Sequence, residues 1–68
     1  MYWVYILASE KDHRTYVGYT SNLEERLNRH NEGRVVSTKH RRPLKVIHKE
    51  WFKNREEAKA RELWWKGR

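Results

Sequence analysis

Apolar and polar residues follow one another along the chain in short blocks that predict separate elements. The aromatic and β-branched run Tyr2 to Ala8 is typical of a strand buried on both faces. The polar stretch 9–14 predicts a turn, and Thr15 to Tyr19 predicts a second strand. Because the gap between them is too short for a crossover helix, the two strands are expected to form an antiparallel hairpin.

A helix is predicted after the hairpin. Ser21 and Glu24 match a capping box, in which a hydroxyl and a carboxylate three residues later bond the first backbone N–H groups. Leu23 and Leu27 then repeat at helical spacing, and Gly33 provides a stop signal. The pattern therefore predicts a helix of about three turns.

Two further elements complete the chain. Leu44 to Phe52 alternates imperfectly and predicts a third strand. Asn54, with Glu57 three residues later, predicts the start of a second helix that runs through Trp65. The order β-β-α-β-α indicates a single α+β domain over residues 1–68, with a three-stranded antiparallel sheet flanked by helices.

Composition limits the class of protein. A chain of 68 residues with 37% hydrophobic content buries only about 60% of its unfolded surface, so its core is thin and must rely on four tryptophans and four tyrosines. The absence of cysteine excludes a thiolate zinc site. No apolar run approaches the roughly 20 residues that cross a bilayer, and no signal peptide opens the chain, so we expect a soluble, cytoplasmic protein without membrane contact.

Positive charge is concentrated in the second half. Residues 1–34 hold five Lys/Arg and five Asp/Glu, whereas residues 35–68 hold eleven and four, which accounts for the net charge of +7. Such asymmetry indicates a surface that binds a polyanion, and nucleic acid is the commonest one inside cells. The alternative is a solvated basic face that only promotes solubility.

An ordered set of motifs runs through these elements. It consists of "VYI" at 4–6, "YVG" at 16–18, Arg26, His30 and Glu62. Together they resemble the GIY-YIG nuclease superfamily over nearly the whole chain, and most closely its small stand-alone bacterial members. The first tripeptide begins with Val4 where the motif's name has glycine.

The resemblance implies a divalent-metal-dependent endonuclease that hydrolyses DNA phosphodiester bonds with one Mg²⁺ or Mn²⁺ ion. Branched, flapped and damaged DNA are the candidate substrates. Small members of the family usually continue with another basic helical stretch, which implies that a C-terminal helical extension is missing here. The alternative function, from a different class, is a non-catalytic basic nucleic-acid-binding module with the same fold.

Phosphodiester hydrolysis needs an activated water, charge stabilisation on the phosphoryl oxygens and help for the leaving oxygen. Arg26 and His30 are four residues apart, so they share a helical face and are expected to reach one phosphate. The resemblance implies that Arg26 stabilises the transferring phosphate; the structural alternative is an ion pair with Glu25. His30 could be a proton carrier, a phosphate ligand or a helix C-terminal cap, and we count it among the catalytic candidates.

Two tyrosines complete the expected catalytic set. Tyr5 and Tyr16 can lie side by side across the hairpin if the register allows it. The resemblance gives both a catalytic role, although buried tyrosines are more often core residues. A phenol acts as a base at neutral pH only if positive charge lowers its pKa. Our hypothesis is that Tyr5 accepts the proton of water and Tyr16 orients the nucleophile, but the sequence does not order these roles.

Glu62 is the expected metal ligand. One carboxylate is enough for an Mg²⁺-like ion that keeps most of its waters. The alternative is an ordinary helical ion pair with Lys59 or Lys66.

DNA binding is expected to involve residues that take no part in the catalytic reaction. Gly18 is expected where a side chain would block the approach of the first helix or of a DNA backbone, or else at a β-bulge. Lys39, Arg41 and Arg42 are expected to neutralise phosphates without reading bases.

The last helix also carries a candidate contact surface. Ala58, Glu62 and Trp65 share one arc of this helix, which turns Leu63 and Trp64 elsewhere. An exposed tryptophan on so small a domain indicates a protein partner or self-association through Leu63 and Trp64.

Overall fold

The computed structural model describes residues 1–67, and it contains all five predicted elements in the predicted order. One element was not predicted, a single turn of 3₁₀ helix inside the basic loop. The elements are β1 (Tyr2–Ser9), β2 (Thr15–Thr20), α1 (Leu23–Asn31), η1 (Lys39–Arg41), β3 (Leu44–Phe52) and α2 (Arg55–Lys66).

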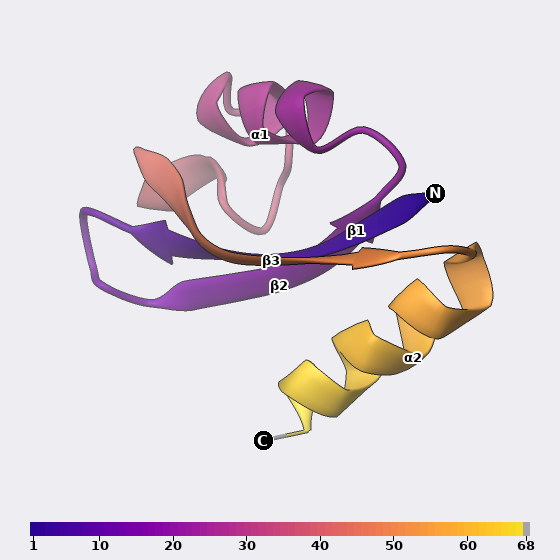
Figure 1. The fold of residues 1–68 in the computed structure, drawn as a ribbon. Helices are drawn as coiled ribbons and strands as arrows, with labels where there is room; N and C mark the ends of the chain where they lie inside the picture. The colour runs from indigo at the N-terminus through magenta and orange to yellow at the C-terminus, as the bar shows by residue number, and fades with distance from the viewer. Residues whose placement is uncertain (68) are drawn as a thin grey trace.

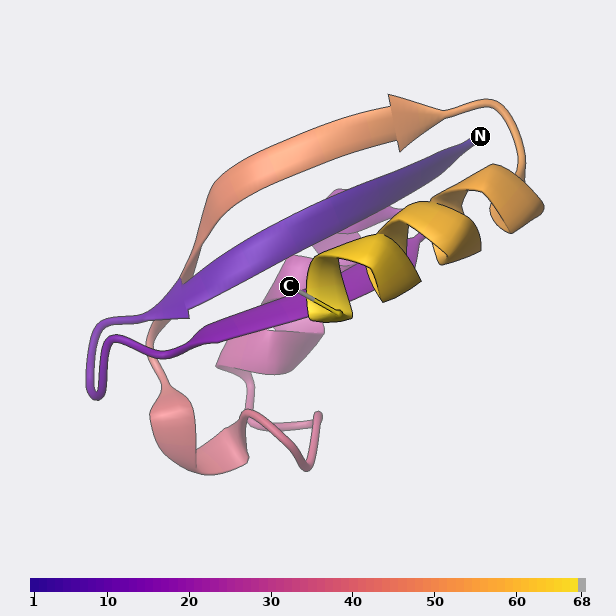
Figure 2. The same ribbon diagram turned by 90° about the horizontal axis from the view of Figure 1, so that it is seen from below.

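The three strands form one antiparallel sheet in the order β2-β1-β3, so the first strand lies in the centre. Helix α1 covers one face of this sheet and α2 the other (Figure 1). Seen from below, the C-terminal half of α2 runs alongside β2 (Figure 2). The predicted α+β class and the hairpin are therefore confirmed.

The core consists of two thin layers separated by β1. Successive side chains of a strand point to opposite faces, and all four residues from Val4 to Leu7 are buried, as predicted for a strand covered on both sides. Tyr5 and Leu7 pack with Leu44 in the layer under α1. On the α2 side, Ala58 is fully buried.

The start of α1 differs from the prediction. Asn22, not Ser21, caps the helix: its backbone is extended, and its Oδ1 accepts a hydrogen bond from the Glu25 N–H at 3.1 Å. The Thr20 hydroxyl oxygen accepts from the Asn22 N–H at 3.2 Å, which fixes the cap residue one position later than expected. The predicted cap of α2 is confirmed, since Asn54 accepts from the Glu57 N–H at 3.0 Å.

Helix α2 has one buried and one exposed face, as the sequence predicted. Leu63 and Trp64 are 57% and 42% exposed, whereas Ala58 is buried against the sheet. The Arg61 guanidinium carbon lies 4.0 Å from the centre of the Trp64 ring. Contact with a partner through Leu63 and Trp64 stays a prediction. Within residues 1–67, neither helix has the length and apolar character needed to cross a bilayer.

Gly18 makes room for the phenol ring of Tyr5. The register places Gly18 opposite Tyr5 without interruption along β2, so there is no bulge at this glycine. A Cβ atom at position 18 would lie 2.5 Å from the Tyr5 hydroxyl oxygen. A larger residue at position 18 is therefore excluded by the Tyr5 side chain of the adjacent strand, and not by the first helix.

We expect Gly18→Ala to lower the free energy of unfolding by about 1–3 kcal/mol, because the added methyl group overpacks against the Tyr5 phenol. Urea denaturation measures this difference. Gly67→Ala is the matched control, since a Cβ there would meet its nearest atom, the Leu63 carbonyl oxygen, at 3.5 Å. An equal, small effect of both substitutions would contradict the packing explanation.

Candidate active site

The hydroxyl of Tyr5 lies at the centre of a buried chain of hydrogen bonds. Tyr5 is 1% exposed, and the Arg26 Nε–H donates to its oxygen at 3.4 Å. The same hydroxyl lies 3.1 Å from Nε2 of His30, whose Nδ1 lies 2.8 Å from the Thr38 hydroxyl oxygen. These bonds tie the central strand to α1 and to the loop that follows it.

The direction of these bonds follows from counting protons. We assign the proton of His30 to Nδ1, because the Thr38 hydroxyl can donate to the Val35 carbonyl, 3.5 Å away, and then accepts from His30. A neutral imidazole carries one N–H, which leaves Nε2 as the acceptor of the Tyr5 proton. The chain therefore runs in one direction, from the Arg26 guanidinium through Tyr5 and His30 to Thr38.

Burial keeps both rings neutral. It lowers the pKa of His30 from 6.5 to about 4, and the positive charge of Arg26 acts in the same direction. Burial also raises the pKa of the Tyr5 phenol, and the hydrogen bond from Arg26 opposes this without reversing it. A phenol acts as a base at neutral pH only if positive charge lowers its pKa. In the protein without ligand the pKa of Tyr5 is raised instead, so Tyr5 does not meet this requirement.

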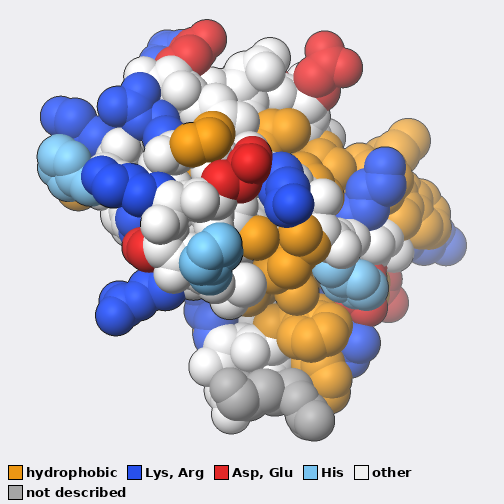
Figure 3. Space-filling model, turned by 90° about the vertical axis from the view of Figure 1, so that its left-hand side faces the viewer, with side chains coloured by type: hydrophobic (Ala, Val, Ile, Leu, Met, Phe, Trp, Pro, Cys, Tyr) orange, Lys and Arg blue, Asp and Glu red, His pale blue; other side chains and the backbone are white. Residues whose placement is uncertain are grey.

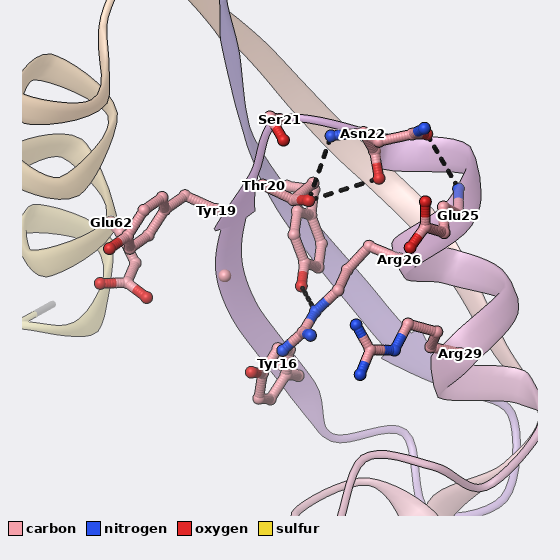
Figure 4. Close-up of a pocket in the computed structure, with 11 residues that line it drawn as sticks. Tyr16, Tyr19, Thr20, Ser21, Asn22, Glu25, Arg26, Arg29 and Glu62 are labelled. Atoms are coloured by element: carbon pink, nitrogen blue, oxygen red, sulfur yellow. Dashed lines mark hydrogen bonds between the residues drawn. The ribbon is translucent and has the colours of Figure 1, made fainter.

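A pocket of about 480 Å³ opens beside this chain. Arg26 reaches it from α1, and Tyr16 lines it from β2 (Figure 4). The ring centres of Tyr5 and Tyr16 are 6.3 Å apart, but the two residues are diagonal across the hairpin, because Tyr16 pairs with Leu7. Tyr16 is partly exposed, so its ring is the one that meets solvent.

Glu62 enters the same pocket from α2, on the other side of β2 (Figure 4). Its side chain is 12% exposed, and one carboxylate oxygen lies 3.1 Å from the Lys66 ammonium group. The ordinary helical ion pair is therefore present, and the same carboxylate faces the pocket. The pocket thus extends around the outer edge of β2, with arginine on one face of the sheet and the carboxylate on the other.

His30 is not where the sequence placed it. Spacing along α1 suggested that Arg26 and His30 would reach the same phosphate, but His30 is 0% exposed and does not line the pocket. Arg26 and His30 do lie on the same face of α1, as their spacing predicts. At position 30, however, this face is covered by Tyr5, Tyr16 and Thr38.

The basic loop also lies outside the pocket. On the face that carries the hairpin turn and η1, Lys and Arg side chains gather on one side and hydrophobic side chains on the other (Figure 3). Arg41 pairs with Asp12 at 3.4 Å, and Arg42 donates to the Lys39 carbonyl at 2.8 Å while its guanidinium packs against Gly33. Arg41 and Arg42 therefore hold the loop together, and DNA contact by Lys39, Arg41 and Arg42 stays a prediction.

Two charged residues of the pocket were missed by the sequence reasoning. Glu25 and Arg29 line it together with Arg26. Both could have been found, because positions 25, 26 and 29 fall on neighbouring parts of one helical surface.

The pocket suits a hard divalent ion. Its two carboxylates, Glu25 and Glu62, lie on opposite sides of it, and residues 1–67 contain no cluster of three or more His, Cys, Asp or Glu side chains that could hold a metal. Mg²⁺ does not need such a cluster, because it binds through one or two carboxylates and keeps several waters. Glu62 is therefore chemically adequate as a single protein ligand.

Comparisons with known proteins identify the family. The model of the GIY-YIG catalytic domain matches residues 1–68. A UPF0213 protein of Clostridium perfringens is 43% identical over 65 residues, which cover 94% of this chain and 69% of the relative. For a UPF0213 protein of Staphylococcus haemolyticus the identity is 42% over 62 residues, covering 90% and 74%.

The UPF0213 protein YazA of Bacillus subtilis is 40% identical over 57 residues, which cover 82% of this chain and 58% of YazA. No solved structure matches the chain significantly. The chain belongs to the GIY-YIG family of catalytic domains, which is a family of nucleases that generally use divalent metal ions. Its relatives among the UPF0213 proteins have names that state no activity.

We expect the protein to lose stability as the pH falls from 6.5 toward 4, because unfolded His30 binds a proton in this range and folded His30 does not. The contribution is fully present above pH 6.5 and is on the order of 3 kcal/mol. Urea denaturation across this range measures it.

His30→Gln should remove this part of the pH dependence, whereas exposed His40→Gln should retain it. Both variants keep the carboxylates Asp12 and Glu50, whose pKa values are lowered by hydrogen bonds, chiefly from the Arg14 N–H and from Arg61 respectively. The difference between the variants thus isolates His30. Parallel pH profiles for His30→Gln and wild type would show that His30 is not held neutral.

Proposed function

We propose that the protein is a divalent-metal-dependent endonuclease that hydrolyses DNA phosphodiester bonds in the pocket around β2. The observation that supports this most is the convergence of a guanidinium, a phenol and a carboxylate from three elements: Arg26 from α1, Tyr16 from β2 and Glu62 from α2. A guanidinium can stabilise charge on the phosphoryl oxygens and a carboxylate can hold the ion that assists the leaving oxygen, and both lie in a domain of a nuclease family.

Each residue has a role that its position allows. Arg26 donates to the phosphoryl oxygens, where charge grows as the bond breaks. Tyr16 is partly exposed and orients the attacking water or the phosphate. Glu62 would hold the Mg²⁺ or Mn²⁺ ion, which when bound supplies charge neutralisation and assists the leaving oxygen.

Tyr5 and His30 act through Arg26 in this proposal. Tyr5 lines the pocket but is only 1% exposed, and its hydroxyl is bonded to the Arg26 guanidinium and to His30. This proposal withdraws the role of proton acceptor from Tyr5, whose pKa is raised by burial, and keeps Tyr16 as the residue that orients the water or the phosphate. Branched, flapped and damaged DNA remain the candidate substrates.

The second candidate, a basic module that binds nucleic acid without cutting it, is favoured by one observation. One oxygen of the Glu62 carboxylate is paired with Lys66 at 3.1 Å, so a metal ion would compete with an ammonium group for this carboxylate. A metal-binding and cleavage test separates the two functions.

We expect the wild-type protein to cleave at least one member of a panel of duplex, flap, junction and single-stranded DNA with Mg²⁺ or Mn²⁺. Glu62→Gln and Arg26→Ala should each reduce the single-turnover rate by about 10²–10³-fold, because each removes one charged group that stabilises the transition state. Glu56→Gln is the matched control, since Glu56 lies on the exposed first turn of α2 outside the pocket.

Salt-sensitive DNA binding by Glu62→Gln should persist while cleavage is lost. Absence of cleavage of every substrate by wild type with either metal, together with normal binding, would instead support the binding module.

We expect Tyr16→Phe to reduce the single-turnover cleavage rate more than Tyr5→Phe. Tyr16→Phe removes a hydroxyl that can contact substrate, whereas Tyr5→Phe removes the bond that holds Arg26. Tyr5→Phe should also lower the free energy of unfolding by about 1–3 kcal/mol, because it leaves Nε2 of buried His30 without a hydrogen-bond partner. Full cleavage activity in both variants would exclude a role for either hydroxyl.

A further inference from the structure

Two arginines of α1, three positions apart, point into the same pocket. Arg26 and Arg29 both line it, and their guanidinium groups extend toward the space beside Tyr16 (Figure 4). Only Arg26 belongs to the motif that identifies the family. Arg29 therefore needs a separate explanation.

Within residues 1–67, no carboxylate neutralises either guanidinium. Arg26 hydrogen-bonds to the Tyr5 hydroxyl, and the Arg29 side chain has neither a hydrogen bond nor an ion pair. Glu25 precedes Arg29 by four residues, the usual spacing for a helical ion pair, yet its carboxylate lies more than 4.0 Å from the Arg29 nitrogens. Glu25 and Glu62 also line the pocket, but neither forms an ion pair with Arg26 or Arg29, so both guanidinium groups can bind an anion that enters.

We infer that Arg29 binds the phosphate next to the scissile phosphate on the same DNA strand. This inference rests on the proposed function, which assigns the scissile phosphate to Arg26. Glu62 lies across β2 from both arginines, so a strand whose scissile phosphate lies between Arg26 and Glu62 has its neighbouring phosphate available to Arg29. A guanidinium suits this contact because it donates two parallel hydrogen bonds to one phosphate.

The alternative is that Arg29 serves only the helix. It lies in the last turn of α1, where a positive charge stabilises the C-terminal end of the helix dipole. In that case Arg29→Ala lowers the stability slightly and leaves DNA binding unchanged.

The test measures binding of a short DNA duplex with unphosphorylated ends, without divalent ions, over a series of salt concentrations. Arg29→Ala should weaken binding about tenfold at low salt and reduce the slope of log K against log[salt] by about 0.9, the value for one phosphate contact on B-DNA. Arg29→Lys should retain the slope, because its ammonium group still neutralises the phosphate.

Arg34→Ala is the matched control. It removes the same charge from a residue outside the pocket that pairs with Glu32 at 2.9 Å, and its salt slope should equal that of wild type. Thermal unfolding of each variant records any change in stability.

A slope for Arg29→Ala equal to that of wild type, or an equal loss in Arg34→Ala, would overturn the inference, as would failure of wild type to bind the duplex. These outcomes are independent of cleavage. A protein that binds with the expected slopes but cuts no DNA with Mg²⁺ or Mn²⁺ would refute the nuclease proposal and leave the Arg29 contact standing.

Discussion

The hydroxyl of Tyr5 is the group on which the arrangement of the site depends. It is buried in the thin layer under α1, where an unpaired hydroxyl would cost about 1–3 kcal/mol. Its two partners, Arg26 and His30, come from successive turns of α1, so satisfying one hydroxyl fixes the rotation of the helix over the sheet. Gly18 follows from the same requirement, because no other residue leaves space for the phenol.

The site consequently has a buried part, which we call the dry half, and a solvent-accessible part, which we call the wet half. In the dry half, burial keeps Tyr5 and His30 neutral at physiological pH. In the wet half, the charged groups are separated by β2, with arginine on one face of the sheet and Glu62 on the other. In the proposed function, a phosphodiester would lie across this separation, between the arginines that donate to it and the carboxylate that would hold a cation.

The sequence predicted the elements well because their signals are local. The cap at Asn54 and the continuous apolar run of β1 are patterns of neighbouring residues, and the structure confirms both predictions. The cap of α1 was wrong by one residue, because Ser21 and Asn22 are both good capping residues and the Thr20 hydroxyl decides between them. The burial of His30 could not be predicted, since it depends on Thr38 and Tyr5, which are distant in sequence.

The position of β2 at the edge of the sheet restricts how this domain can assemble. Edge strands present unpaired backbone groups to which another strand can add. A strand added along β2 would cover the rim that the pocket wraps around, and so would close the site. The sheet can therefore be extended, within one chain or between two, only at the opposite edge along β3 if the pocket is to stay open to a nucleic acid backbone.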